Sequence, residues 1–330
     1  MSAHPGLAEV VEARSRIHGL AGVTPLIESP ALATALGAPV WLKAECLQET
    51  GSFKVRGAAN ALLSLPEDRR AAGVVAVSSG NHGRAVAHVA RALGLPATIC
   101  LSARVPPFKV EAIRALGARV IVAGPDQDDA DVAARRIVRE EGSTFVHPFD
   151  DPAVIAGQGT IALEVLDERP GISTFVVPLS GGGLISGIAV AAKGVNPATR
   201  VVGVSQDRGP AMYLSMRAGK VVPVVEEDTL ADALAGGLGE ENHHTLEMCR
   251  SLVDETVLVS EAEIAGAMRW LHREHGLRVE GGGAVGVAAA LSGGIRSAGP
   301  VVIVLSGGNI GGDAFVAVVG GVSGASGDPA

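Results

Sequence analysis

Short apolar runs rich in β-branched residues alternate along this chain with longer alanine-rich stretches, and this alternation constrains the fold more than any other feature. The runs do not alternate apolar with polar residues, which is typical of parallel strands covered on both faces. The predicted strands are residues 74–77, 97–101, 119–122, 174–177, 201–204, 257–259 and 300–305. The predicted helices are residues 83–93, 109–116, 129–141, 184–193 and 261–275. The pattern predicts an α/β protein with parallel-rich sheets flanked by helices.

The strand–helix units fall into two sets, which indicates two domains. The first set extends from about residue 51 to residue 148, and the second from about residue 155 to residue 310. The turn-rich segment His-Pro-Phe-Asp-Asp-Pro at 147–152 is the best place for the chain to cross between them. Residues 316–330 are rich in glycine, alanine and serine, and we predict that they form a disordered tail.

The composition argues against nucleic acid as a partner. The chain has 27 Lys and Arg residues against 35 Asp and Glu residues, a formal net charge of −8, without a local block of basic residues. Only 3% of the residues are aromatic, too few for a platform on which single-stranded bases stack.

The sequence also predicts a cytoplasmic protein that does not cross a membrane. The uncharged stretch 172–192 is nominally long enough to span a bilayer, but Pro178 and three glycines at 181–183 interrupt it. The N-terminal residues lack the apolar core of a signal peptide. Cys46, Cys100 and Cys249 form no CxxC pair, so we expect reduced thiols.

One lysine lies in the motif Gly-Ser-Phe-Lys-Val-Arg-Gly at residues 51–57. Lys54 is expected at a helix start, where the positive end of the helix dipole disfavours an ammonium group. An amine with a lowered pKa is what a Schiff-base lysine requires. The spacing alone does not distinguish this role from that of an ordinary solvated lysine.

Several loops with small polar residues and glycines follow predicted strands or open predicted helices. The loop 78–83 (Ser-Ser-Gly-Asn-His-Gly) either binds a carboxylate through backbone N–H groups or caps a helix. Residues 180–186 (Ser-Gly-Gly-Gly-Leu-Ile-Ser) form a plausible phosphate cradle, and with Asp207 they fit a nicotinamide-binding pattern imperfectly. The runs 306–309 and 280–284 are either ligand loops or simple turns.

Metal and hydrolase motifs are missing from the sequence. The pair His243-His244 and the run 272–275 do not reproduce the HExxH spacing, so we predict no metal site. Without a Gly-x-Ser-x-Gly elbow, a hydrolase triad has no nucleophile candidate.

Taken in order, the loops resemble those of the threonine/serine dehydratases and serine racemases among the fold-type II pyridoxal-phosphate enzymes. The motifs that carry the resemblance are Gly-Ser-Phe-Lys-x-Arg-Gly at 51–57, Gly-Asn-His at 80–82, the run at 150–160 and Ser-Gly-Gly-Asn at 306–309. The resemblance implies a two-domain, tryptophan synthase β-like fold. Its large cofactor-binding domain would comprise residues 1–50 and 151–315, and its small domain residues 51–150. It also implies a homodimer or homotetramer.

The resemblance assigns roles to individual residues. Lys54 would carry pyridoxal 5′-phosphate and move the Cα proton. The other cofactor-binding residues would be Phe53, Asn81, Ser180, Gly181, Gly182, Gly183, Leu184 and Ser306. The substrate carboxylate would be bound by Ser78, Ser79, Gly80, Asn81 and His82.

The implied activity is that of an ammonia-lyase. A β-hydroxy amino acid such as L-threonine or L-serine would lose water and be deaminated to a 2-oxo acid and ammonia. Ser79 matches serine racemases, in which it is the acid/base on the opposite face, so Ser79 is a second catalytic candidate and racemisation is an alternative. Ser205 and Ala211 replace the carboxylates that hold a divalent cation in those racemases.

Two further alternatives and one narrower resemblance remain open at this point. The motifs at 207–213, 233–239 and 279–285 look like those of the hydroxyectoine-utilization dehydratase branch. A nicotinamide-dependent dehydrogenase would leave the Lys54 motif unexplained. A ligand sensor without catalysis is the non-enzyme alternative.

Overall fold

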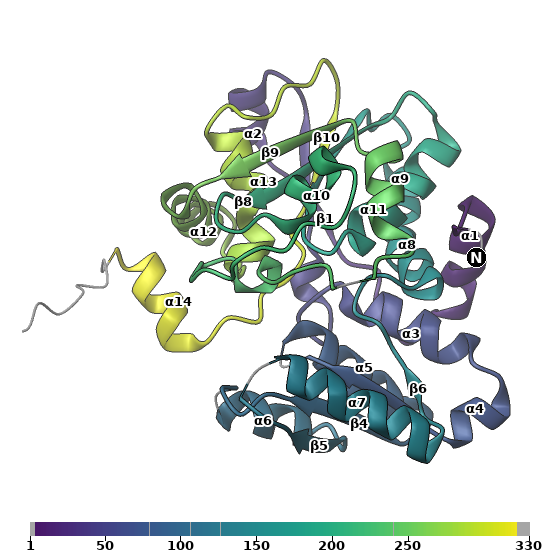
Figure 1. The fold of residues 1–330 in the computed structure, drawn as a ribbon. Coiled ribbons are helices and arrows are strands. Elements are labelled where there is room, and N and C mark those ends of the chain that lie inside the picture. Colours follow the sequence, from purple (N-terminus) through teal and green to yellow (C-terminus); the bar gives the residue numbers. More distant parts are fainter. Residues whose placement is uncertain (1–3, 79, 106, 126, 240, 322–330) are drawn as a thin grey trace, which may run out of the picture.

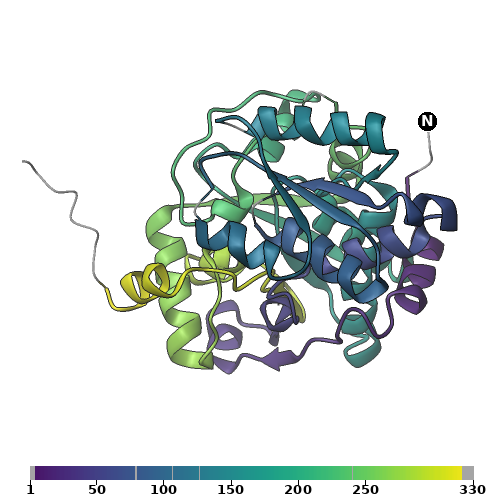
Figure 2. The same ribbon diagram turned by 90° about the horizontal axis from the view of Figure 1, so that it is seen from below.

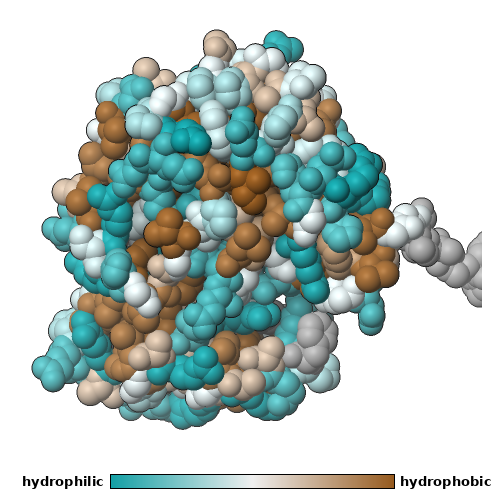
Figure 3. Space-filling view, turned by 180° about the vertical axis from the view of Figure 1, so that it is seen from behind, coloured by the Kyte–Doolittle hydropathy of each residue, from teal (hydrophilic) through white to brown (hydrophobic). Residues whose placement is uncertain are grey.

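The strands of the protein form two separate sheets, each flanked by helices (Figure 1). The computed structural model describes residues 4–78, 80–105, 107–125, 127–239 and 241–321. Seen from below, the smaller sheet and its helices lie in front of the rest of the molecule (Figure 2). On the face opposite that of Figure 1, the surface is hollowed between the two bodies (Figure 3).

The larger sheet has six strands in the order β1-β2-β10-β7-β8-β9. Its strands are β1 (Leu26–Glu28), β2 (Val40–Lys43), β7 (Thr174–Pro178), β8 (Arg200–Gln206), β9 (Glu255–Val259) and β10 (Val301–Val304). Only β1 runs antiparallel to its neighbour; the other pairs are parallel.

Both faces of the larger sheet are covered, as the continuous apolar runs predicted. Val176, Val202 and Ile303 face one cluster of buried side chains, whereas Phe175, Val201 and Val302 face another. The first cluster draws on α2 (Pro30–Leu36), α12 (Glu261–His275), α13 (Gly281–Leu291) and α14 (Gly312–Val319). The second draws on α1 (Leu7–Arg16), α8 (Pro152–Glu168), α9 (Gly183–Val195), α10 (Ala211–Ala218) and α11 (Thr245–Leu252).

The smaller sheet has four parallel strands in the order β5-β4-β3-β6. These are β3 (Val74–Val77), β4 (Ala97–Leu101), β5 (Arg119–Val122) and β6 (Thr144–Phe145). The surrounding helices are α3 (Lys54–Ser64), α4 (Glu67–Ala71), α5 (Asn81–Leu93), α6 (Pro107–Arg114) and α7 (Gln127–Glu141), and two short 3-10 helices are Glu45–Leu47 and Asp232–Leu234. Helix α3 packs against both α5 and α8, so it connects the two bodies.

The predicted α/β class with parallel-rich sheets is confirmed. All seven predicted strands are present, and β3, β4 and β5 have the predicted bounds. The exact domain boundaries stay a prediction. Helix α14 covers residues 316–319 of the tail predicted to be disordered, because Phe315 anchors it on His272 and Arg278. Residues 322–330 of that tail lie outside the described residues.

Candidate active site

The loops singled out in the sequence come together where the two bodies meet. Phe53 N–H donates to Ser306 O at 3.0 Å, and Gly308 N–H donates to Gly51 O at 2.9 Å. Asn309 Nδ2 donates to Asn81 Oδ1 at 2.6 Å. The lysine loop, the loop after β10 and the start of α5 are therefore neighbours, although they lie far apart in the sequence.

Lys54 is the first residue of α3, as the sequence predicts. Its Nζ donates to Pro148 O at 2.7 Å and lies 5.2 Å from the centre of the Phe53 ring. The residue as a whole is partly exposed, whereas its amine is enclosed by protein, and this burial lowers the pKa of Lys54 to about 8. Burial, rather than the helix dipole that we invoked from the sequence, is the cause of the lowered pKa. At pH 7 roughly a tenth of the amine is thus unprotonated, far more than for a lysine with the ordinary pKa.

The glycine loop at 180–184 follows β7 and opens α9. Gly182 is the N-cap of α9 with a φ of 88°, a conformation that favours glycine. The loop packs closely on its surroundings: a Cβ at Gly181 would lie 2.3 Å from the Phe149 ring, and one at Gly182 2.8 Å from Met212 Cε. Ser180 Oγ donates to Leu234 O at 3.0 Å, which fixes the start of the loop.

The backbone N–H groups of this loop are available to an anion. In the described part of the chain, those of Gly181 to Ile185 donate to no other protein group. N–H groups at a helix start carry a partial positive charge and bind phosphate. The loop therefore has the donors, and the glycines that the close packing requires, to hold a phosphate group.

Two predicted cofactor contacts lie beside the lysine loop. Ser306 follows β10, is 5% exposed, and its Oγ makes only a long contact of 3.5 Å to Gly282 O. Its hydroxyl is therefore free to hydrogen-bond a ligand atom. Asn81, the first residue of α5, lies between Glu280 and Asn309 and hydrogen-bonds both side chains.

The predicted carboxylate loop follows β3 and leads into α5. Gly80 N–H donates to Ser78 Oγ at 3.2 Å, and Gly80 is the N-cap of the helix. The ring of His82 is buried and its Nε2 lies 2.9 Å from Val146 O; burial lowers its pKa to about 3. This ring is thus neutral and turned toward Val146. Among the described residues, the backbone N–H of His82 has no protein acceptor, so it can donate to a ligand. Ser79 lies outside the described residues.

Sequence reasoning treated residues 147–152 as a domain crossing and residues 150–160 as a family motif but gave neither a role in the site, whereas the structure shows that residues 148–150 build it. Pro148 O accepts the bond from Lys54, and Phe149 packs on Gly181 and Gly183. Asp150 accepts the backbone N–H groups of His243, His244 and Thr245 at 2.6–3.0 Å, and these bonds lower its pKa against the effect of burial. The hydrogen bonds of Pro148 and Asp150 join residues 93 to 95 positions apart, so no local signal could have revealed them.

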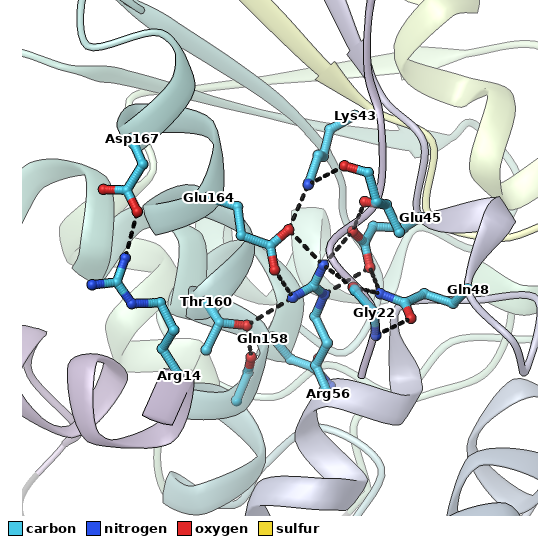
Figure 4. A network of polar contacts seen from close by, with 12 residues as sticks. Arg14, Gly22, Lys43, Glu45, Gln48, Arg56, Gln158, Thr160, Glu164 and Asp167 are labelled. Carbon is cyan, nitrogen blue, oxygen red and sulfur yellow. Dashed lines mark hydrogen bonds and ion pairs between the residues drawn. The ribbon is translucent and has the colours of Figure 1, made fainter. Parts of the chain in front are cut away.

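A buried ion cluster holds the helix that begins with Lys54 (Figure 4). Arg56 forms paired hydrogen bonds with Glu45, at 2.8 and 2.8 Å, and with Glu164, at 2.6 and 2.8 Å. Lys43 Nζ donates to Glu164 at 2.5 Å and to Thr24 O at 2.7 Å. The four ionic groups balance in charge and tie α3 to β2 and α8. Sequence analysis did not identify Lys43, Glu45 or Glu164.

Within the described ranges, the structure contains no group of three His, Cys, Asp or Glu side chains that could hold a metal ion. Likewise, none of the described helices is long and apolar enough to cross a membrane.

Comparisons with known proteins agree with this geometry. A family model described as "Pyridoxal-phosphate dependent enzyme" matches residues 17–307. An L-threonine ammonia-lyase of Thermotoga maritima is 44% identical over 304 residues, which cover 92% of this chain and 75% of that protein. Among solved structures, maize serine racemase has a TM-score of 0.90 at 34% identity, covering 95% of this chain and 96% of that one. The processed form of threonine deaminase isoform 2 from Solanum lycopersicum has a TM-score of 0.88 at 32% identity, covering 96% of this chain and 93% of that one.

Proposed function

The chain belongs to the family of pyridoxal-phosphate dependent enzymes, and we propose on this premise that it is an ammonia-lyase acting on a β-hydroxy amino acid. Its substrate would be L-threonine or L-serine, and its products a 2-oxo acid and ammonia. The observation that carries the proposal is the enclosed amine of Lys54 at the start of α3, with its pKa lowered to about 8. The match to this family does not support the alternative of a nicotinamide-dependent dehydrogenase.

The residues present fit pyridoxal phosphate. The free N–H groups of the loop at 181–185 suit a phosphate, and the amine of Lys54 suits a carbonyl carbon. Phe53 offers an apolar face, Asn81 an amide donor, and Ser306 a neutral hydroxyl for a ring nitrogen. Together they offer partners to each polar part of the cofactor.

When bound, pyridoxal phosphate withdraws electron density from the Cα of the amino acid and so makes its Cα proton acidic. Lys54 Nζ takes that proton, because its amine is enclosed and its pKa, lowered to about 8, makes the unprotonated form accessible near neutral pH. The backbone N–H groups at the start of α5 bind the substrate carboxylate and orient the Cα–H bond toward the amine. Departure of the β-hydroxyl as water, followed by hydrolysis of the product, gives the 2-oxo acid and ammonia.

The direct test is turnover of L-threonine and L-serine by the purified protein with pyridoxal phosphate, followed as 2-oxo acid and as ammonia. We expect the two products in equal amounts from at least one of these substrates. Cofactor binding without any 2-oxo acid from either would contradict the proposed reaction while leaving the family intact.

Substituting Gly182 by alanine should weaken cofactor binding. A positive φ costs an L-residue about 1–2 kcal/mol, and the new Cβ would meet Met212, Cys249 and Thr245 within 2.9 Å. We expect the dissociation constant for pyridoxal phosphate to rise roughly tenfold or more. The control is Gly266→Ala in α12, where a Cβ meets nothing within 4 Å. Equal affinity in both variants would contradict a phosphate role for the loop.

Serine racemisation is the second candidate, and the 34% identity to maize serine racemase over nearly the whole chain supports it. The proposal assigns Lys54 to one face of the substrate and Ser79 to the other. Chiral analysis of serine after incubation distinguishes the two activities. If D-serine forms in the wild type, Ser79→Ala is expected to abolish it and to leave 2-oxo acid formation largely intact.

The hydroxyectoine-derived substrate, a cytoplasmic location and assembly into a homodimer or homotetramer stay predictions from the sequence. If the protein binds the cofactor but turns over both threonine and serine poorly, that result would indicate the hydroxyectoine-derived substrate.

A further inference from the structure

Three side chains from distant parts of the chain form one hydrogen-bonded cluster beside Lys54. Asn81 Nδ2 donates to Glu280 Oε1 at 2.7 Å. Asn309 Nδ2 donates to Asn81 Oδ1 at 2.6 Å and to Thr50 O at 2.8 Å. Asn81 begins α5, Glu280 is the N-cap of α13, and Asn309 lies in the loop after β10. The resemblance assigned a role to Asn81 but none to Glu280 or Asn309.

This cluster fixes which way the Asn81 amide points. A backbone carbonyl only accepts hydrogen bonds, so the atom of Asn309 that faces Thr50 O is the nitrogen. That nitrogen also faces Asn81, which identifies the facing atom of Asn81 as its oxygen. The nitrogen of Asn81 must then face Glu280, whose carboxylate accepts. If the amide of Asn81 were flipped, its nitrogen would face the nitrogen of Asn309, and two hydrogen-bond donors would oppose each other.

One N–H of Asn81 remains for a ligand. The amide nitrogen has two hydrogens, and Glu280 takes one of them. Within the described part of the chain, the second hydrogen has no protein acceptor, and the amide oxygen is occupied by Asn309. Asn81 can therefore present an N–H donor to whatever binds beside Lys54.

Glu280 is costly to bury, which suggests that it has a function. It is 4% exposed, and burial, together with Asp232, raises its pKa to about 7 against the opposing effect of Asn81. Lys109, which pairs with Asp232 at 3.6 Å, and the Cys46 thiol also face it. The carboxyl packs so tightly on the next loop that a Cβ at Gly307 would lie 2.3 Å from its Oε1.

We propose that Glu280 is a positioning residue, which with Asn309 holds the Asn81 amide so that its second N–H points to an anionic oxygen of the bound cofactor. The inference rests on the proposed function, because it takes the ligand to be pyridoxal phosphate. An N–H donor at that place stabilises the oxygen in its ionised form, and an amide turned the other way would repel it.

The test compares three variants with the wild type. Glu280→Gln keeps an acceptor oxygen for Asn81 Nδ2, whereas Glu280→Met removes it at similar length. Asn309→Ala removes the donor that holds Asn81 Oδ1. It provides a second test of the proposal if Glu280→Met does not fold. The measurements are the dissociation constant for pyridoxal phosphate, the visible absorption spectrum of the bound cofactor, and kcat and KM for L-threonine.

We expect Glu280→Gln to bind the cofactor within about threefold of the wild type and to keep its visible spectrum. Glu280→Met and Asn309→Ala are expected to bind roughly tenfold more weakly, the equivalent of one hydrogen bond, and to lose visible absorbance from the ionised form. In both, kcat should fall more than KM rises. A merely structural role would instead lower stability and leave the spectrum unchanged.

Two results would overturn the inference alone. One is wild-type affinity and spectrum in folded Glu280→Met or Asn309→Ala. The other is equal weakening in Glu280→Gln and Glu280→Met, which would show that charge and not amide orientation matters. A wild-type protein that binds no pyridoxal phosphate would overturn the inference together with the proposed function.

Discussion

Replacing Lys54 by alanine is expected to lower the turnover of L-threonine by at least roughly 10³-fold, because the variant loses the amine that takes the Cα proton. The fold should survive. Among the described residues, the enclosed amine donates only to Pro148 O, and its lowered pKa means that the fold disfavours the charged form. The measurement is 2-oxo acid formation at saturating cofactor, together with the circular dichroism spectrum of each variant.

Lys220→Ala is the matched control for this experiment, since Lys220 is exposed and lies outside the loops of the site. It should retain wild-type turnover. Near-normal turnover in folded Lys54→Ala would show that the reaction does not require Lys54.

The largest expected loss of stability follows from replacing Arg56 by methionine. Burial would raise the pKa of Glu45, but the guanidinium of Arg56 lowers it below its usual value, so Glu45 is held ionised inside the protein. Removing one partner of such a pair leaves a buried charge without compensation, which costs about 3–5 kcal/mol. Urea denaturation should therefore show a clearly lower midpoint for Arg56→Met.

Arg14→Met is the comparison for this stability test, because Figure 4 shows Arg14 paired with Asp167 close to the buried cluster. That pair has exposed fractions of 42% and 71% and should contribute less than about 1 kcal/mol. If Arg56→Met does not fold, Glu45→Gln can replace it. This variant is also expected to lower the urea midpoint, but by less. Similar losses for Arg14→Met and Arg56→Met would contradict the account of the ion cluster.

Residues with a continuous apolar pattern made much of the fold predictable. Residues 74–77 were predicted with their observed bounds, because both faces of β3 are buried and every residue is apolar. By contrast, β2 was missed, since its last residue is a lysine. Lys43 is tolerated in the core only because Glu164 and Thr24 O satisfy it, and that compensation comes from 121 and 19 residues away.

The site was predictable as a set of loops but not as a set of contacts. The positions of Lys54 and of residues 180–184 follow from local motifs next to strands and helix starts. The role of Glu280 does not, because its partner Asn81 is 199 residues away. The run 280–284 was noticed in the sequence and could not be told from a turn, since only the fold brings it to the lysine loop.

The most direct test of the central claim is to identify the residue that carries the cofactor. The purified protein is incubated with pyridoxal phosphate, its visible spectrum is recorded, and borohydride is added before peptide mapping. The account predicts a yellow band that borohydride removes, with the pyridoxyl group attached to Nζ of Lys54 and to no other lysine. Absence of the band, or attachment elsewhere, would contradict it.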